Sequence, residues 1–122
     1  MKKLLFIIVV SISLFSCKKE ESNSSEKAED SSLAYGKKLF EGEGNCIACH
    51  QTEKTIIGPS IQEIAKIYKD KNASIVSFLK AESNPIVDPS KYEIMKTNFA
   101  ITEEMTDEQL LALEDYILSF SK

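Results

Sequence analysis

Two cysteines and the chain's single histidine lie together in the segment Cys46-Ile47-Ala48-Cys49-His50. Thiols at this spacing can each form a thioether with one of the two vinyl groups on neighbouring edges of a porphyrin. The histidine that follows can then place its imidazole beneath the central metal as an axial ligand. This pattern is the C-x-x-C-H signature of covalent haem attachment. It predicts one haem c that is attached to Cys46 and Cys49 and ligated by His50.

Three other kinds of site use paired cysteines, and each fits this chain less well. A disulfide between Cys46 and Cys49 would close a very small loop and add little stability. A thioredoxin-like redox pair needs a βαβ setting, whereas the sequence shows helical and no strand periodicity. A structural zinc site needs four nitrogen or sulfur ligands, and too few cysteines and histidines remain once Cys17 has another role.

The N-terminal residues have the pattern of an export signal. Lys2 and Lys3 supply a positive start, and the apolar stretch 4–15 that follows is too short to span a bilayer as a helix. This stretch leads into Ser16-Cys17, which resembles the lipobox of bacterial lipoproteins. The resemblance implies that Cys17 is acylated and becomes the new N-terminus, held at a membrane surface by its lipid. The alternative is a cleavable signal or anchor followed by an incidental cysteine.

The sequence divides into three parts on this interpretation. Residues 1–16 are the lipoprotein signal peptide, 17–32 are the lipidated cysteine and a flexible charged linker, and 33–122 are a folded domain. The linker is expected to be flexible because it has no large apolar side chain to bury. Its lysine-plus-acidic start also resembles signals that direct lipoproteins to the cell surface in some Bacteroidetes-type bacteria. The protein is therefore expected outside the cytoplasm, anchored to a bacterial membrane on the periplasmic face or at the cell surface.

The segment 33–122 has helical periodicity and no strand pattern, so we expect an all-α domain. Helices are expected to begin at four capping or turn signals, which are Ser32, Ser60, Asn72 and Thr106. Pro85 and Pro89 forbid a continuous helix between the third and the fourth of these helices. Residues 82–105 are accordingly expected to be mostly irregular. A loop of this length is uncommon in a small domain unless it has a function.

Features outside the haem motif resemble the class I cytochrome c family over most of 33–122. The segment 35–40 is similar to that family's first helix, in which a glycine, here Gly36, allows a close crossing with the last helix. Tyr116 stands at the aromatic position expected on the opposite helix. The resemblance implies a small cytochrome c fold with about four helices packed around one covalently bound haem.

The resemblance also implies how the haem is surrounded. Gly58 and Pro59 follow His50 as in relatives where the proline carbonyl accepts a hydrogen bond from the imidazole, which would fix the orientation of the ring. The family usually takes a second axial ligand, a thioether, from the loop before the last helix, and Met95 lies in that loop. Met105 is the weaker alternative, because it directly precedes the last helix and is better placed to fill the core.

A haem with both axial positions filled has no open site for a substrate and can only change its oxidation state. We therefore expect an electron carrier and not an enzyme, with redox proteins such as a respiratory complex, an oxidase or a reductase as partners. Two other functions remain open. One is a haem enzyme or sensor with an open sixth position, peroxidase-like or gas-binding, and the other is a dedicated electron-transfer subunit of a larger oxidoreductase.

Charge narrows the range of partners. The formal net charge is -4, and none of the 15 basic residues is an arginine, so a phosphate-binding surface is not expected and nucleic acid is not an expected partner. A small-molecule substrate is not expected either, because the haem has no open axial position. The acidity of the domain suggests docking on a basic or apolar patch of a partner. Six carboxylates make the C-terminal region acidic, and we expect them to form a solvated helix face before a docking site; they are Glu103, Glu104, Asp107, Glu108, Glu114 and Asp115.

Overall fold

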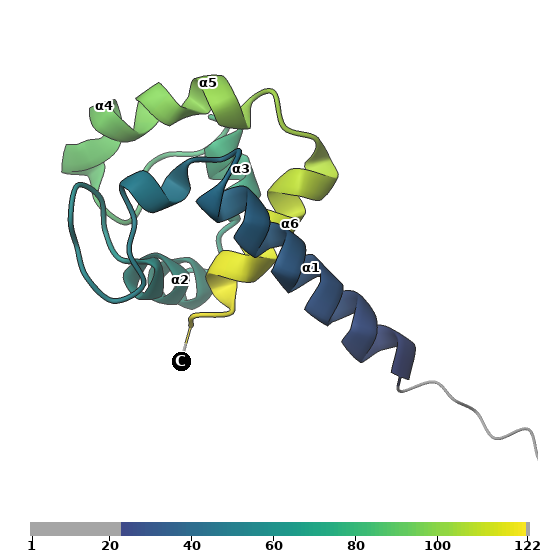
Figure 1. Cartoon of the computed structure of the whole chain (residues 1–122). Coiled ribbons are helices and arrows are strands. Elements are labelled where there is room, and N and C mark those ends of the chain that lie inside the picture. The colour runs from purple at the N-terminus through teal and green to yellow at the C-terminus, as the bar shows by residue number, and fades with distance from the viewer. Residues whose placement is uncertain (1–22, 122) are drawn as a thin grey trace, which may run out of the picture.

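Helices dominate the computed structural model, which describes residues 23–121 (Figure 1). In chain order the α-helices are α1 (Asn23–Glu41), α2 (Ile61–Asp70), α3 (Ile75–Leu79), α4 (Tyr92–Met95), α5 (Phe99–Thr102) and α6 (Asp107–Leu118). Three short 3-10 helices lie between them, η1 (Cys46–Ala48), η2 (Pro89–Lys91) and η3 (Lys96–Asn98). In this part of the chain the only β pairing is an isolated bridge between His50 and Thr55. The expected all-α fold is confirmed, and α1, α2, α3 and α6 are its four anticipated helices.

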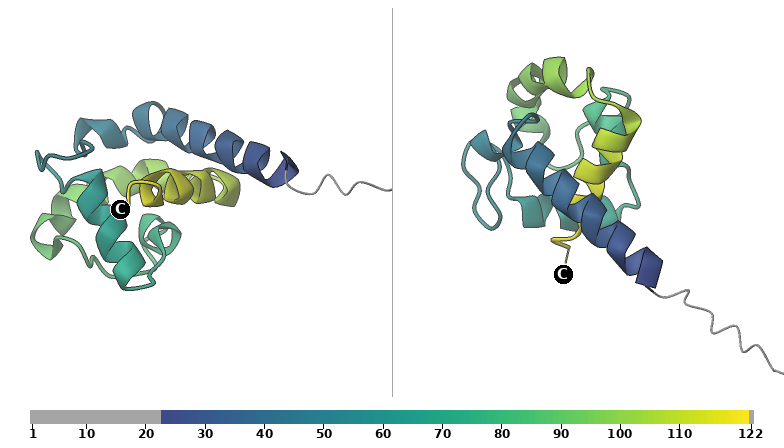
Figure 2. Two further views of the ribbon diagram at one scale, coloured as in Figure 1. Left: turned by 90° about the horizontal axis from the view of Figure 1, so that it is seen from below. Right: turned by 45° about the vertical axis from the view of Figure 1, so that its right-hand side comes forward.

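Helix α6 is the central element of the domain. It contacts α1 on one side and both α2 and α3 on the other, so it lies between these two groups (Figure 2). Leu110 and Leu113 of α6 are almost completely buried, with exposed fractions of 1% and 0%. Apolar side chains from α1, α2 and α3 complete the core around them; they include Leu39, Phe40, Ile61, Ala65, Tyr68, Ile75 and Leu79.

The crossing of α1 with α6 depends on Gly36. A Cβ atom added at this glycine would lie 1.9 Å from the carbonyl oxygen of Ala112, so the two backbones touch where a side chain would otherwise stand. The rings of Phe40 and Tyr116 pack beside the crossing with centroids 5.5 Å apart. The close helix contact and the aromatic partner that were predicted from the sequence are both confirmed.

We expect Gly36→Ala to lower the free energy of unfolding by about 3 kcal/mol, because the new methyl group meets a backbone oxygen that cannot move without separating the helices. Helix propensity alone predicts the opposite sign, since alanine is the better helix former. Urea unfolding of the haem-loaded protein measures the change. The matched control is Ala34→Gly on the exposed side of α1, which should cost only about 0.5–1 kcal/mol. A Gly36→Ala protein at least as stable as the original would contradict a tight crossing.

The N-terminal part of α1 differs from the expectation. The helix begins at Asn23, whereas a start at Ser32 was expected, so that prediction is wrong, and residues 23–32 of the expected linker are helical. The Ser32 hydroxyl does not cap the helix but donates a hydrogen bond to Asp115 Oδ2 at 2.8 Å, which ties α1 to α6. Once the packed part of α1 has formed, each added turn avoids the cost of nucleation, and polar residues can extend the helix into solvent.

The other expected helix starts agree with the structure in most details. The Ser60 hydroxyl accepts a hydrogen bond from the Glu63 backbone N–H and caps α2. Thr106 and Gln109 form a complete capping box at α6, in which each side chain accepts a hydrogen bond from the other's backbone N–H. Helix α3 is capped by Ser74, close to the expected start after Asn72.

The segment between α3 and α6 is far more regular than expected. Residues 89–102 run through η2, α4, η3 and α5 in an almost unbroken helical path, so the prediction of mostly irregular chain is wrong there. Pro89 occupies the first turn of η2, where its missing N–H costs nothing, and Asp88 caps that turn by accepting from the Ser90 N–H. The hydroxyl of the fully buried Thr102 donates to the Leu79 carbonyl at 2.7 Å and fastens the end of this path to α3.

Within residues 23–121, no helix is long and apolar enough to cross a membrane. The expected signal peptide (1–16), the expected lipidation site Cys17 and the start of the expected linker lie outside the described residues.

Candidate functional site

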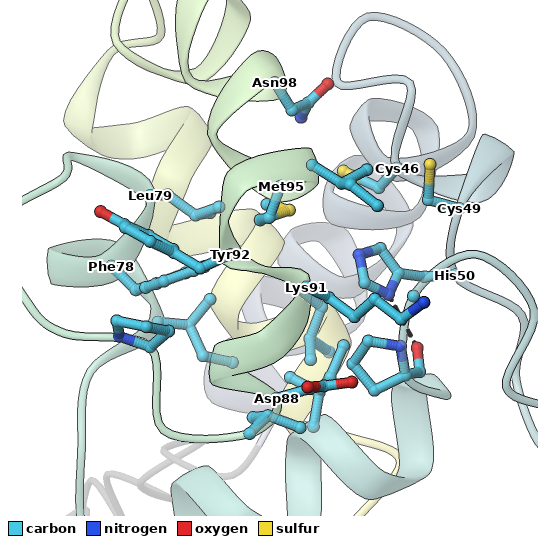
Figure 3. Close-up of a pocket in the computed structure, with 18 of the residues that line it drawn as sticks. Cys46, Cys49, His50, Phe78, Leu79, Asp88, Lys91, Tyr92, Met95 and Asn98 are labelled. Carbon is cyan, nitrogen blue, oxygen red and sulfur yellow. Dashed lines mark hydrogen bonds between the residues drawn. The ribbon is translucent and has the colours of Figure 1, made fainter.

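An apolar cavity of about 210 Å³ lies between η1, the loop that follows it, α2, α3 and the path from η2 to η3 (Figure 3). Its walls include apolar side chains from most of the fold, among them Phe40, Ile64, Tyr68, Ile75, Phe78, Leu79, Leu113 and Ile117. Six residues that the sequence assigned to haem also line it, namely Cys46, Cys49, His50, Gly58, Pro59 and Met95. Met105 does not line the cavity. The fold thus brings together residues that are far apart in the sequence.

The short helix η1 presents the two cysteines. Asn45 before it adopts the left-handed conformation with φ of 51°, which turns the chain sharply away from α1. The backbone N–H groups of Cys49 and His50 both donate to the Cys46 carbonyl, at 3.1 and 2.9 Å, so the segment is a tight coil with three reactive side chains. Cys46 is buried, Cys49 is half-buried, and the two are not joined by a disulfide.

The imidazole of His50 is held by the residues just before α2. Its Nδ1 lies 2.7 Å from the Pro59 carbonyl oxygen, as predicted from the sequence. Burial lowers the pKa of the imidazole, and the hydrogen bond to Pro59 opposes this shift. A neutral ring next to a carbonyl must donate from Nδ1, because the oxygen can only accept. The lone pair is therefore on Nε2, the nitrogen through which the ring is free to ligate a metal.

The two methionines have different surroundings. Met95 belongs to α4, is half-buried and reaches into the cavity, with its sulfur on the side of the cysteines and His50 (Figure 3). Met105 is 7% exposed and packs in the hydrophobic core, as the sequence suggested. An added Cβ at Gly44 would lie 3.5 Å from the Met105 methyl group, which places this side chain beneath the turn after α1.

This set of groups fits a haem better than a bare metal ion. In the part of the chain that the structure describes, no three His, Cys, Asp or Glu side chains gather where they could hold a metal. The cavity instead offers two thiols at one end, one imidazole nitrogen, one thioether and mostly apolar walls. A macrocycle that brings its own four nitrogen ligands and a large apolar surface matches these groups.

Comparison with known proteins agrees with the geometry. The family model described as cytochrome c matches residues 33–121. The chain belongs to the cytochrome c family. The family binds covalently attached haem c, and the C-x-x-C-H segment formed by Cys46, Cys49 and His50 supplies its attachment here.

One relative is similar over a short segment. A cytochrome c-552 of Nitrosomonas europaea is 54% identical over 28 residues, which are 23% of this chain and 27% of that protein. The match thus spans about a quarter of the relative's length.

Sequence reasoning missed several residues that shape the haem cavity of this cytochrome. Tyr92 and Phe99 pack around Phe78 with ring centroids 6.2 and 5.4 Å away, and this aromatic cluster supports α4. The Asn98 side chain donates to the Gly44 carbonyl at 3.1 Å and links the methionine-bearing path to the loop before the cysteines. A signal for this helix was present, because Tyr92, Met95 and Phe99 stand at helical spacing. The expectation of irregular chain was based instead on Pro85 and Pro89.

We expect Gly58→Ala to disturb the proximal side of the haem. A Cβ at this position would lie 2.6 Å from His50 Cε1, so the ring must tilt and its hydrogen bond to Pro59 must lengthen. The loaded protein should lose about 2 kcal/mol of unfolding free energy and show shifted His50 ring signals in NMR spectra. The control is Ile56→Ala in the same loop, whose side chain is 42% exposed and should leave these signals in place. Unchanged His50 ring signals in Gly58→Ala would show that the loop moves to accommodate the methyl group and that the ring does not tilt.

Proposed function

We propose that this cytochrome is an electron carrier in which His50 and Met95 are the two axial ligands of a single covalently bound haem. The observation that carries the proposal is that both side chains reach into one apolar cavity from different walls, His50 from the segment after η1 and Met95 from α4 (Figure 3). The bound haem supplies one-electron cycling between Fe(II) and Fe(III). With both axial positions filled there is no site for a substrate, so the protein is a carrier and not an enzyme.

The polypeptide fixes the positions of the two side chains that are proposed as axial ligands. Pro59 holds the imidazole in one tautomer and one orientation. The bond from Asn98 to Gly44 and the bond from Thr102 to Leu79 both hold the part of the helical path that follows Met95. A ligand set that keeps its geometry needs little rearrangement when the charge changes, and this suits rapid electron transfer.

A redox titration of the haem-loaded protein, followed by absorption spectroscopy, tests this function. We expect a reversible one-electron transition, a low-spin spectrum in both oxidation states, no binding of carbon monoxide and no turnover of peroxide. A high-spin ferric spectrum with peroxide turnover would instead support a haem enzyme or sensor with an open sixth position.

We also propose that the carrier is tethered outside the cytoplasm to a bacterial membrane and exchanges electrons with redox proteins there, such as a respiratory complex, an oxidase or a reductase. The positive start, the apolar stretch 4–15 and Ser16-Cys17 support a lipoprotein signal. Acyl chains on Cys17 would then hold the mature protein at the lipid surface.

Cys17→Ser should abolish lipid attachment. Without the thiol no acyl chain can be attached, so the variant should either remain unprocessed or partition into the aqueous phase in a detergent separation, whereas the original chain enters the detergent phase. Mass spectrometry of the original protein should show an increase of lipid size on Cys17. Ser16→Ala retains the thiol and a small neighbour, and it serves as the control. If the Cys17→Ser protein has lost its signal peptide and still partitions as the original does, lipid attachment is contradicted.

A further inference from the structure

Glu114 of α6 differs from the other acidic residues of the C-terminal region. The other five carboxylates are exposed, whereas Glu114 is half-buried. Its Oε2 accepts hydrogen bonds from the Val76 backbone N–H at 2.9 Å and from the Ser74 hydroxyl at 3.1 Å. Both donors lie at the start of α3, 38 and 40 residues away from Glu114 in the sequence. Glu114 therefore links the central helix α6 to the start of α3 and differs from the solvated face expected for this region.

This contact provides acceptors that the first turn of α3 needs. The first N–H groups of a helix have no partner inside the helix. The Ser74 hydroxyl accepts from the Ser77 N–H, and the carboxylate of Glu114 accepts from the Val76 N–H, so the second cap comes from another helix. A negative charge is also favourable at a helix N-terminus. Because α3 has only five residues, it is too short to be stable alone, and its position depends on such contacts.

The opposite end of α3 has a weaker tie to α6. Lys80 Nζ lies 2.6 Å from Asp107 Oδ1, but the Asp107 side chain is 79% exposed. An ion pair so open to water contributes little to stability. The position of α3 on α6 therefore depends mainly on Glu114 and on apolar packing.

Helix α3 supports the segment that carries Met95. Its Phe78 and Leu79 line the haem cavity, and Figure 3 shows both on the opposite side of Met95 from the attachment cysteines. The Phe78 ring packs on Tyr92, the first residue of α4, with centroids 6.2 Å apart. The Leu79 carbonyl accepts the hydrogen bond from Thr102 at the end of the same helical path. A shift of α3 would therefore move the wall against which this path packs.

The carboxylate of Glu114 also lies close to a second lining residue. Tyr68 of α2 lines the cavity and is 3% exposed. Burial, and to a lesser extent the negative charge of Glu114, raise the pKa of the Tyr68 hydroxyl to about 12. The Tyr68 ring packs on Phe78 with centroids 6.5 Å apart. Glu114 itself does not line the cavity, so any effect on the haem passes through the residues that it holds.

We propose that Glu114 is a positioning residue for the methionine side of the haem: it fixes the start of α3 on α6, and α3 then keeps Met95 in place as an axial ligand. The inference rests on the proposed ligation by His50 and Met95 and adds a residue outside the cavity to it. The physical reason is preorganisation, because a ligand that is already held in position loses less entropy when it binds.

Binding of imidazole to the ferric, haem-loaded protein tests this role, because added imidazole must displace the thioether. We expect Glu114→Ala to bind imidazole roughly tenfold more tightly than the original protein, since Met95 is then held less firmly. Glu114→Gln is the conservative variant. Its amide oxygen can still accept from Val76 and Ser74, so its imidazole affinity should stay within about threefold of the original.

Asp115 supplies the matched control. It is the next residue of α6 and also accepts a hydrogen bond from another helix, in this case from the Ser32 hydroxyl of α1 at 2.8 Å. Neither Asp115 nor Ser32 lines the cavity. Asp115→Ala should lower the urea midpoint, as Glu114→Ala does, but should change imidazole affinity by less than about twofold. Equal gains in imidazole affinity in the two alanine variants would show a general loss of stability and would overturn the positioning role.

Two further readouts separate the possible failures. The Val76 amide proton should move upfield in NMR spectra of Glu114→Ala and stay in place in Asp115→Ala, and an unchanged Val76 signal in Glu114→Ala would contradict the contact itself. If Glu114→Ala does not fold with haem, Glu114→Asp keeps the charge on a shorter side chain and should bind imidazole about threefold more tightly; unchanged affinity would contradict the inference. A spectrum that Met95→Ala leaves unaltered would overturn the proposed ligation instead.

Discussion

Met95→Ala should convert a closed six-coordinate haem into one with an open or water-bound sixth position. The ferric protein is expected to lose the long-wavelength charge-transfer band of thioether-ligated haem and to change from low spin to high spin. Its reduction potential should fall by on the order of 0.1 V or more, because a thioether opposite histidine favours the ferrous form. Absorption and magnetic resonance spectra, together with a redox titration, measure these changes. The reason lies in the cavity, where Met95 is the methionine that reaches the same space as His50.

Met105 supplies the matched control. Met105→Leu conserves the volume of a side chain that is 7% exposed in the core, so it should cost less than about 1.5 kcal/mol of stability and leave the spectrum unchanged. Because Met105 was the weaker candidate for the sixth ligand, loss of the charge-transfer band in Met105→Leu, and not in Met95→Ala, would reverse the assignment.

Cys46→Ala combined with Cys49→Ala should abolish cooperative folding in addition to haem attachment. Much of the apolar surface of the domain faces the haem cavity, including buried residues of the central helix such as Leu113 and Ile117. A domain of about ninety residues is marginally stable without a cofactor to complete its core. The double variant should keep some helical circular dichroism but lose its cooperative thermal transition.

The single replacements separate attachment from packing. Cys46 is buried, and its thiol is in so apolar a place that burial raises its pKa to about 11, whereas Cys49 is half-buried. Either variant alone retains one thioether bond and should remain folded with haem, although less stable than the original. A double variant that still unfolds in one sharp transition without haem would show that the polypeptide core suffices.

Local pattern was enough to identify the haem. The spacing of Cys46, Cys49 and His50 reflects covalent chemistry that must be encoded in adjacent residues, so it is visible without a fold. The capping box at Thr106 and the cap at Ser60 are equally local, since the partner groups lie within one helical turn. The helix crossing at Gly36 and the hydrogen bond of Pro59 were anticipated because the family resemblance implied which distant groups these residues contact.

Tertiary structure decided what depends on contacts between distant segments. Helix α1 extends to Asn23 because a helix that has already formed adds turns without a further nucleation cost. Pro89 starts a helical path instead of preventing one, because packing on the rest of the domain outweighs local propensity. The sequence favoured Met95 as the second axial ligand and kept Met105 as the weaker alternative. The fold separates them by burying Met105 in the core and directing Met95 into the cavity. Composition shows only that the chain is acidic overall, whereas the fold shows that none of the six carboxylates of the C-terminal region lines the cavity.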